Sequence, residues 1–414
     1  MKTFYTILFA FCAVFLSVNN SHANWTKSNT GTVFGSKNIM SLTQNGTNIY
    51  AGTFGVGVLL STDSGITWNY RNNGMTVLKL YSVFVDGNSI FAGTYGGGAF
   101  LSTDNGSNWT AINNGGIPSS PNTAVNTFAS SGNNVFLGCS GGLWLTSNNG
   151  SNWTKSSNGL PSSIYISDII IVENYIFLGD YYTESNIGLF LSTDNGANWT
   201  AANNGLTDKG IRALATNGTD IFAGTSTGVF LSTDKGGNWT KVSAGLTDLS
   251  IYSLTTSGSY IFAGTETGSV FFSSNKGKNW MKVSKNFTTS SIVSLAIIGT
   301  NIFSGTFGDG LWIAPLSQVT EISETPVVNS STIVSPNPTS GLTTINYTVT
   351  EPGAVSLSII NSLGMETANL NDSQILEPGK YSLNYDVANL TPGIYFLKII
   401  TGNISETKKF VVIR

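Results

Sequence analysis

The sequence predicts an all-β protein, a seven-bladed β-propeller followed by a small Ig-like β-sandwich. An eight-residue pattern ending in Trp occurs six times, starting at residues 61, 102, 146, 192, 232 and 273, so successive copies lie 40 to 46 residues apart. A repeat of this length is typical of stacked supersecondary units. Each repeat also holds four short apolar segments separated by turn residues, as the four antiparallel strands of a propeller blade require. The pattern stops after residue 315, which predicts a second domain.

The first 23 residues have the features of a secretory signal peptide. Lys2 precedes an apolar run at residues 4–18, and Ser21-His22-Ala23 provides a cleavage site of small residues. Cleavage would remove Cys12 and the single His of the chain. The mature chain would then have one Cys, Cys139, which we expect to be a buried or half-buried structural thiol. An intrachain disulfide, His-dependent catalysis and a His-ligated metal are excluded for that chain.

Composition excludes several classes of partner. Charged residues make up 10% of the chain, Gly occurs 47 times and the formal net charge is −3. Without a basic cluster, nucleic acid and anionic membrane are not expected as partners. Beyond the signal peptide, no stretch of 18 uninterrupted apolar residues predicts a membrane-spanning segment. No motif indicates a cofactor, a metal or a set of catalytic residues, and we expect a monomeric propeller.

Each copy of the pattern has the chemistry of a tight hairpin turn. A short Asp or Asn side chain can accept backbone N–H bonds, and a Gly two positions later allows a positive φ. The Trp that ends each copy can pack against the neighbouring repeat. The six pairs are Asp63 and Trp68, Asp104 and Trp109, Asn148 and Trp153, Asp194 and Trp199, Asp234 and Trp239, and Asn275 and Trp280.

These copies resemble the Asp-box (BNR) repeat, whose form is Ser/Thr-x-Asp-x-Gly-x-x-Trp. Four copies match, and the copies at 146 and 273 have Asn in place of Asp. The resemblance covers roughly residues 24–315 and implies a β-propeller of the superfamily that includes sialidases, sortilin-type receptors and xyloglucanases. It implies little about function, since the Asp-box in that family lies at a turn remote from the active face.

Seven inner strands are expected, although there are only six boxes. They start at Ile39, Leu80, Val125, Ile166, Ile211, Ile251 and Ile292. The seventh repeat ends at Pro315 without its fourth strand. Asn24-Trp25-Thr26-Lys27 matches Asn152-Trp153-Thr154-Lys155, which follows a box. The N-terminus is therefore predicted to supply the missing strand and close the ring.

The C-terminal part divides into a polar linker, residues 316–332, and a domain of alternating apolar residues, 333–414. This domain resembles the type A C-terminal sorting domain of the bacterial type IX secretion system. The resemblance rests on Ser335–Gly341, Asn361–Gly364, Leu390–Tyr395 and the basic, apolar end Lys408–Arg414. It implies a Bacteroidota-type bacterium, the type IX machinery as partner, and secretion or surface attachment after Sec export, with cleavage in the linker.

A ligand site is predicted on the face opposite the boxes. In a propeller the loops between the second and third strands share one face with the loops that enter the next blade. The first set offers Phe54, Tyr95, Asp180, Tyr181, Tyr182, Glu184, Glu266, Phe307 and Asp309; the second adds Arg71, Lys79, Tyr165, Asp208 and Asp248. The binding candidates among them are Phe54, Tyr95, Asp180, Tyr181, Tyr182, Glu184, Phe307 and Asp309.

Three functions fit these residues. Aromatic rings and polar side chains favour a surface protein that binds a glycan or a protein. A glycoside hydrolase that uses two loop carboxylates is the second hypothesis, and a structural or adhesion protein is the third. A sialidase is disfavoured because Arg71 and Arg212 are the only arginines before residue 316, too few for an Arg triad.

Overall fold

The computed structural model describes residues 23–28, 37–182, 187–284, 290–320, 332–349, 353–362, 365–376, 379–401 and 404–414. The chain divides into two units, residues 1–321 and 322–414. The predicted signal peptide lies outside the described residues except for Ala23. Among the described residues, no helix has the length and apolar character that crossing a membrane requires.

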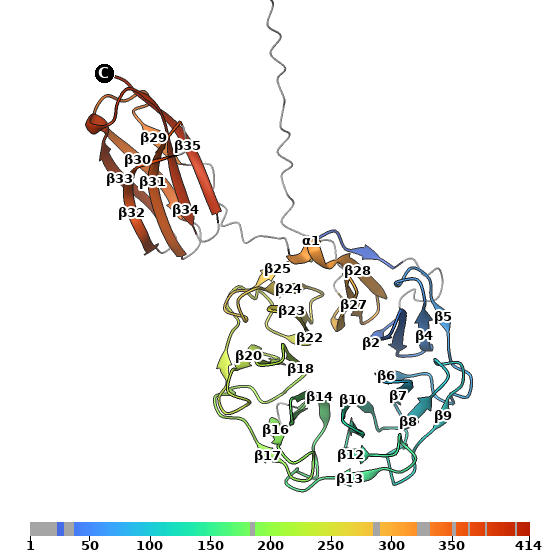
Figure 1. Cartoon of the computed structure of the whole chain (residues 1–414). Helices are drawn as coiled ribbons and strands as arrows, with labels where there is room; N and C mark the ends of the chain where they lie inside the picture. The colour runs from blue at the N-terminus through green and yellow to red at the C-terminus, as the bar shows by residue number, and fades with distance from the viewer. Residues whose placement is uncertain are drawn as a thin grey trace, which may run out of the picture. The chain divides into compact units, whose positions relative to one another are not determined.

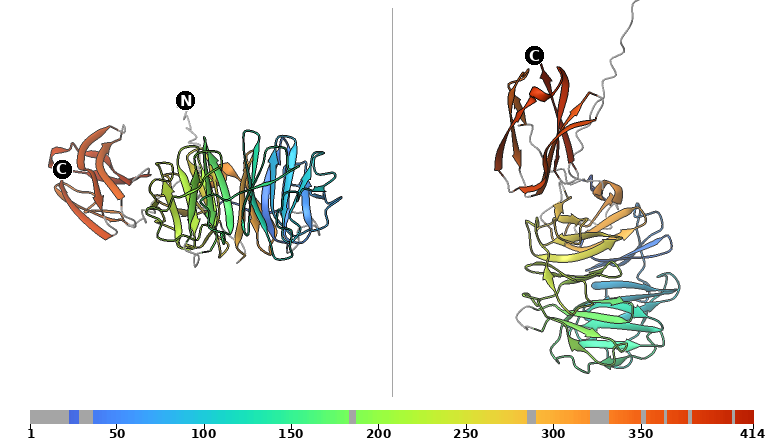
Figure 2. Two further views of the ribbon diagram at one scale, coloured as in Figure 1. Left: turned by 90° about the horizontal axis from the view of Figure 1, so that it is seen from below. Right: turned by 60° about the vertical axis from the view of Figure 1, so that its left-hand side comes forward.

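The first unit is a ring of seven four-stranded antiparallel sheets within the described part of the chain (Figure 1). Seen from the side, the ring is a flat disc (Figure 2, left). From the inner to the outer strand, the sheets are β2 (Ile39–Asn45), β3 (Asn48–Thr53), β4 (Gly57–Ser61) and β5 (Asn69–Tyr70); β6 (Leu80–Asp86), β7 (Ser89–Thr94), β8 (Ala99–Ser102) and β9 (Thr110–Ala111); β10 (Val125–Ser131), β11 (Asn134–Cys139), β12 (Gly142–Thr146) and β13 (Thr154–Ser156); β14 (Ile166–Val172), β15 (Tyr175–Asp180), β16 (Leu189–Ser192) and β17 (Thr200–Ala201); β18 (Ala213–Thr216), β19 (Ile221–Thr225), β20 (Gly228–Ser232) and β21 (Thr240–Lys241); β22 (Ile251–Ser257), β23 (Tyr260–Thr265), β24 (Val270–Ser273) and β25 (Met281–Lys282); and β26 (Ile292–Ile298), β27 (Asn301–Thr306), β28 (Leu311–Pro315) and β1 (Thr26–Lys27).

The inner strands form a closed cycle. Each contacts the inner strand of the next sheet, and β26 contacts β2. Six of the seven begin at the predicted residue, but β18 begins at Ala213 and not at Ile211. The backbone N–H of Ile211 donates to Asp180 O of the preceding sheet at 2.7 Å, which places Ile211 outside the regular ladder of its own sheet.

The last sheet combines the two ends of this unit. Strand β1 pairs antiparallel with β28, with Thr26 opposite Ile313 and Lys27 opposite Trp312. Trp25 is only 7% exposed, and its Nε1 donates to Val283 O at 3.2 Å. Ala23, assigned to the signal peptide by the sequence, is buried and forms a bridge with Ser284. Residues from the start of the chain therefore supply the fourth strand of the sheet that contains β26.

The box turns are held by a small set of side-chain bonds. In the second copy, the Asp104 carboxylate accepts bonds from Ser102 Oγ at 2.8 Å and from Asn108 N at 2.8 Å and Nδ2 at 2.7 Å. These hydrogen bonds, chiefly from Asn108, lower the pKa of Asp104 to about 2. Asn148 also accepts through Oδ1, from Thr146 Oγ1 and Asn152 N. An amide has only that one acceptor oxygen, so this turn has no equivalent of the bond to the second oxygen of Asp104.

The hydrophobic core lies between adjacent sheets. Tyr50, Val58 and Leu60 of the first sheet pack with Phe100 and Trp109 of the second in one buried cluster. The same arrangement recurs around the ring, where Trp153, Trp199, Trp239 and Trp280 each join a cluster that includes the preceding sheet. Cys139 is buried, as predicted, and this burial raises the pKa of its thiol to about 12.

Helix α1 (Leu316–Thr320) follows β28 directly. Its Val319 is fully buried, and the backbone N–H of Leu316 donates to Thr300 O at 2.8 Å. The first five residues of the predicted linker thus pack on the first unit, because an apolar side chain every third position gives this short segment one buried face. Residues 321–331 of that linker lie outside the described residues.

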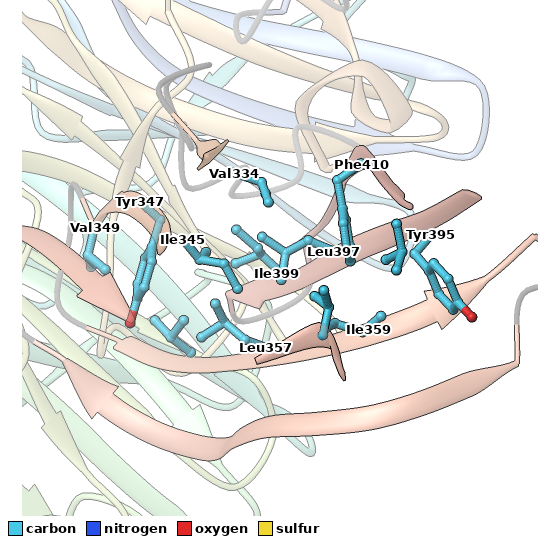
Figure 3. Close-up of a cluster of buried hydrophobic side chains, with 13 residues drawn as sticks. Val334, Ile345, Tyr347, Val349, Leu357, Ile359, Tyr395, Leu397, Ile399 and Phe410 are labelled. Atoms are coloured by element: carbon cyan, nitrogen blue, oxygen red, sulfur yellow. The ribbon is translucent and has the colours of Figure 1, made fainter. Parts of the chain in front are cut away.

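The second unit is a β domain of two sheets around one core. Figure 3 shows this core, in which Ile345, Leu357, Leu397 and Phe410 converge from both sheets. The sheets consist of β29 (Ile333–Ser335), β30 (Leu342–Val349) and β33 (Gly379–Asp386), and of β32 (Glu366–Leu376), β31 (Gly353–Asn361), β34 (Gly393–Thr401) and β35 (Ile404–Val412), with the 3-10 helix η1 (Val387–Asn389) after β33.

Candidate functional site

A β-bulge near the start of the inner strand recurs around the ring. In the first sheet, Ile39 pairs with Thr53 and Ser41 with Gly52, so Met40 is the extra residue. The bulge lies at the end where β3 leads into the loop to β4, which is the face opposite the box turns. The bulge residues of six sheets are Met40, Tyr81, Asn126, Ser167, Tyr252 and Val293. In the remaining sheet, Arg212 takes the equivalent position directly before β18, where its N–H donates to Gly224 O at 2.9 Å.

All seven of these residues line one cavity of about 270 Å³. Because they come from the inner strands of all seven sheets, this cavity is the central channel of the ring. The other lining residues are apolar apart from Asp168 and five that bear hydroxyl groups, which are Ser41, Ser82, Thr127, Ser253 and Ser294. Burial raises the pKa of Asp168 to about 6, although its carboxylate accepts bonds from Leu214 N and Ile169 N.

Two aromatic triads surround the mouth of the channel. The first joins Phe54, Tyr81 and Tyr95, with ring centroids 5.5 to 6.2 Å apart. The second joins Tyr165, Tyr181 and Tyr182, at 5.0 to 5.7 Å. Four of these six residues are predicted binding residues, Tyr165 was expected to share their face, and Tyr81 was not singled out. The structure therefore brings together aromatic residues from three different sheets.

The two triads lie close to one another. Burial raises the pKa of Tyr81, and the neighbouring hydroxyls of Tyr95, Tyr181 and Tyr182 raise it further. The pKa of Tyr252 is also raised, first by burial and then by Tyr181, which shares a hydrogen bond with it. We call the seven residues of this region the channel-mouth cluster: Phe54, Tyr81, Tyr95, Tyr165, Tyr181, Tyr182 and Tyr252.

Two family models match the chain. Residues 334–413 match the secretion system C-terminal sorting domain, and residues 10–204 match the DUF6242 beta propeller domain. The chain is a β-propeller protein with a type IX secretion sorting tail. Such a tail indicates a protein that is secreted or attached to the cell surface. A comparison with curated proteins finds no match.

Solved structures similar to this propeller protein include both enzymes and non-enzymes. PorZ, an essential surface component of the type IX secretion system of Porphyromonas gingivalis, is 16% identical with a TM-score of 0.54, over 93% of this chain and 61% of PorZ. A GH74 xyloglucanase from Xanthomonas campestris is 14% identical with a TM-score of 0.57, over 72% of this chain and 54% of the enzyme. YCF48 from Cyanidioschyzon merolae is 15% identical with a TM-score of 0.54, over 71% and 98%. The propeller protein thus spans about three fifths of PorZ, and these identities show the fold alone.

The carboxylates of the propeller face are mostly engaged in structural bonds. Asp180 is fully buried and accepts a bond from Tyr165 N at 2.8 Å. Asp309 pairs with Lys27 at 2.6 Å and accepts from Trp312 Nε1 at 3.0 Å. Among the predicted binding residues, these two therefore hold loops and the N-terminal strand in place.

Two further loop carboxylates on this face have similar structural bonds. Asp208 accepts from Ser226 Oγ at 2.7 Å and Gly210 N at 3.1 Å, and Asp248 accepts from Thr267 N and Oγ1 at 3.0 and 2.6 Å. Burial raises the pKa of each, but the hydrogen bonds outweigh it and hold both below the ordinary value. Their geometry is that of loop-stabilising groups.

The remaining candidates take different positions. Phe307 is 52% exposed and lies outside both triads. Glu184 lies outside the described residues. Arg71 does not belong to the channel mouth, because its side chain lies beside Gly106 of the next box turn and its carbonyl accepts a bond from Trp109 Nε1 at 2.8 Å. Strand β5 ends at Tyr70, so Arg71 follows too soon after the first box to reach the opposite face.

Three residues of the channel mouth were missed as site residues. Tyr81, Arg212 and Tyr252 each follow the first apolar residue of a predicted inner strand, where alternation assigns them to an ordinary strand position. A bulge turns Tyr81 and Tyr252 toward the channel, while Arg212 reaches it from the residue directly before β18. The available signal was the repeat itself, since the same position contains Met, Tyr, Asn, Ser, Arg, Tyr and Val in the seven copies.

Proposed function

We propose that this chain is an exported or surface-attached binding protein whose propeller binds a glycan or a protein ligand at the channel-mouth cluster. The observation that carries the proposal is a cluster of seven aromatic side chains, of which Tyr81 and Tyr252 line the cavity. Tyr182 is 46% exposed, and most of the others are partly exposed. Aromatic groups beside a concave polar cavity are typical of ligand sites.

The architecture assigned to this protein is a monomeric seven-bladed propeller of the Asp-box type. Its support is the closed cycle of inner strands and the six turns with equivalent side-chain bonds. The domain boundaries we assign are residues 24–315 for the propeller and 333–414 for the sorting domain. Both boundaries follow from the sequence pattern, with α1 packed on the end of the propeller.

Binding is favoured over hydrolysis because the loop carboxylates are engaged in structural hydrogen bonds or an ion pair. A glycoside hydrolase needs two carboxyl groups facing each other across the bound sugar. Asp180, Asp208, Asp248 and Asp309 each hold structural hydrogen bonds or an ion pair. Glu266 accepts a bond from Ser250 Oγ at 2.7 Å. Hydrolysis by loop carboxylates is therefore the second hypothesis, supported by the similarity in fold to xyloglucanase.

Substitution in the channel-mouth cluster tests the binding site. The full-length exported chain is screened against polysaccharides and surface proteins, with product release measured on the same polysaccharides. The double variant Tyr81→Ala/Tyr181→Ala is expected to lose binding by roughly a hundredfold, because both triads lose a ring. Tyr70→Ala, on the outer strand β5 and 51% exposed, is the matched control and is expected to bind normally.

Two results would contradict this site. The binding hypothesis is contradicted if the chain releases products from a polysaccharide and Glu266→Gln abolishes their release. The site is wrong if the double variant retains full affinity at an unchanged melting temperature.

Export by the type IX route gives a second expectation. With Sec processing after Ala23 and sorting through residues 333–414, the propeller should reach the cell surface or the medium with Asn24 as its first residue. Mass spectrometry of the chain recovered from a type IX-competent host checks the N-terminus. A truncation after residue 332 should keep the propeller in the periplasm. Surface delivery of that truncated chain would contradict a sorting role for the C-terminal domain.

A further inference from the structure

The inner strands leave few unpaired main-chain donors and acceptors for a ligand at the channel mouth. Side chains of one inner strand bond to the main chain of the next, which occupies donors and acceptors that face the channel. These bonds are Ser41 Oγ with Val83 N at 2.8 Å, Ser82 Oγ with Val125 O at 3.3 Å, Asp168 Oδ2 with Leu214 N at 2.8 Å, Ser253 Oγ with Ile292 O at 2.8 Å and Ser294 Oγ with Ile39 O at 2.8 Å. Recognition of an extended peptide by strand addition needs unpaired main-chain groups. Recognition at this mouth therefore depends on side chains.

Arg212 is a fixed cation at this mouth. Its guanidinium lies 4.5 Å from the ring centre of Tyr252, and Nη1 donates to Ser250 Oγ at 2.6 Å. Ser250 in turn donates to Glu266. Within the described residues, no carboxylate forms an ion pair with Arg212. A guanidinium has five N–H donors in a planar fork, so one bond to Ser250 leaves donors for a second group.

Lys79 provides a second cation beside the cluster. Its Nζ lies 5.7 Å from the ring centre of Phe54, and the side chain is exposed. The described part of the chain gives Lys79 no ion-pair partner either. Asp208 and Asp248 accept bonds from Ser226 and Thr267, which lie in the loops between the second and third strands of the next sheet. Asp168 lines the same cavity but accepts bonds from Leu214 N and Ile169 N, and Glu266 accepts its bond from Ser250. Arg212 and Lys79 thus have no ion-pair partner among the described carboxylates, and a ligand of complementary charge is an anion.

From this charge and this lining, we infer that the channel mouth recognises an acidic glycan whose sugar units carry carboxylates. Arg212 binds a uronate carboxylate through paired N–H donors, the geometry that an Arg fork matches best. The rings of Tyr81, Tyr181 and Tyr252 contact the sugar, and their hydroxyls bond to its hydroxyl groups. The cavity of about 270 Å³ admits a single sugar-sized group and not a folded partner. This inference rests on the proposed binding function and specifies its ligand.

The test compares one polymer in its acidic and its neutral form. Calorimetry on the full-length exported chain uses oligogalacturonate, alginate and hyaluronate, together with the methyl-esterified form of each, which has the same backbone without free carboxylates. The chain is expected to bind at least one acidic polymer and to lose roughly tenfold or more in affinity when that polymer is esterified. Affinity should also fall as salt rises.

Variants then assign the carboxylate contact to Arg212. Arg212→Gln is expected to weaken binding of the acidic polymer by roughly ten- to a hundredfold, the range for a lost charge-assisted pair. Arg212→Lys keeps the charge but not the fork and should give an intermediate loss. Arg71→Gln removes the other propeller arginine, on the box side, and should leave affinity unchanged.

The outcomes separate this inference from the binding function itself. Equal affinity for the esterified polymer, no effect of Arg212→Gln, or no binding to any of the acidic polymers overturns the acidic-glycan inference. In each of these cases, a neutral glycan or a peptide that binds the unmodified chain but not Tyr81→Ala/Tyr181→Ala leaves the binding site standing. Full affinity of that double variant for the acidic polymer overturns both.

Discussion

Removal of the N-terminal strand should destabilise the propeller more than any other change of similar size. Deleting residues 24–28 removes β1 and leaves β28 as an unpaired edge inside the ring. It also removes Trp25, which is buried between the last two sheets, and the ion pair of Lys27 with Asp309. We expect the free energy of unfolding to fall by at least the 3–5 kcal/mol or so that deletion of a buried Trp side chain costs.

Single substitutions distinguish loss of the Trp from loss of the strand. Trp25→Ala should reproduce about 3–5 kcal/mol of the effect, since Trp25 Nε1 donates to Val283 O as Trp280 Nε1 donates to Val242 O one sheet earlier. Thr26→Ala is the control on the same strand, because its side chain is exposed and a change within about 1 kcal/mol is expected. Calorimetric melting of the full-length chain measures all three. Ring closure by β1 would be refuted by a deletion variant that melts at the temperature of the unmodified chain.

The sequence was sufficient for the fold because the repeat presents the same local rules many times. One copy of the box pattern would predict a turn, but six copies at similar spacing identify sheets of the same construction. The strand supplied by Asn24–Lys27 was predictable because it carries the Trp that follows the other boxes. Sequence did not reveal that the residue before the box Gly also has a positive φ, as Ser64 and Asn105 do. This tightens each turn beyond what a single Gly requires.

The site was only partly predictable, because a bulge changes which way a side chain points. Phe54, Tyr95 and Tyr181 directly follow the second strand of a sheet, so the sequence alone assigns them to the face opposite the box turns. Tyr81 and Tyr252 stand inside a predicted strand, where alternation gives no reason to turn them toward a ligand. For Asp180 the sequence predicts a ligand contact, because a carboxylate follows the strand at the loop face. In the structure Asp180 is fully buried and accepts a bond from Tyr165 N.

The box Trp residues should differ in how strongly their indole N–H stabilises the ring. Trp109 is 4% exposed, and its Nε1 donates to Arg71 O of the preceding sheet at 2.8 Å and to Gly106 O at 3.1 Å. Trp153 is equally buried, but its Nε1 has no acceptor among the described residues. Replacement by Ala should cost about 3–5 kcal/mol at either position, because both fill the space between sheets.

Replacement by Phe isolates the hydrogen bond from the packing. Trp109→Phe and Trp153→Phe reduce the side-chain volume equally, but Trp109→Phe also leaves the Arg71 carbonyl without its donor. We therefore expect Trp109→Phe to lower the free energy of unfolding by about 1–3 kcal/mol more than Trp153→Phe does. Denaturant unfolding, followed by far-ultraviolet circular dichroism so that the lost fluorophore does not matter, gives the difference between the two variants. Equal losses would show that the box Trp acts through its volume alone. A larger loss for Trp109→Phe would show that the indole bond to the preceding sheet helps to hold neighbouring sheets together.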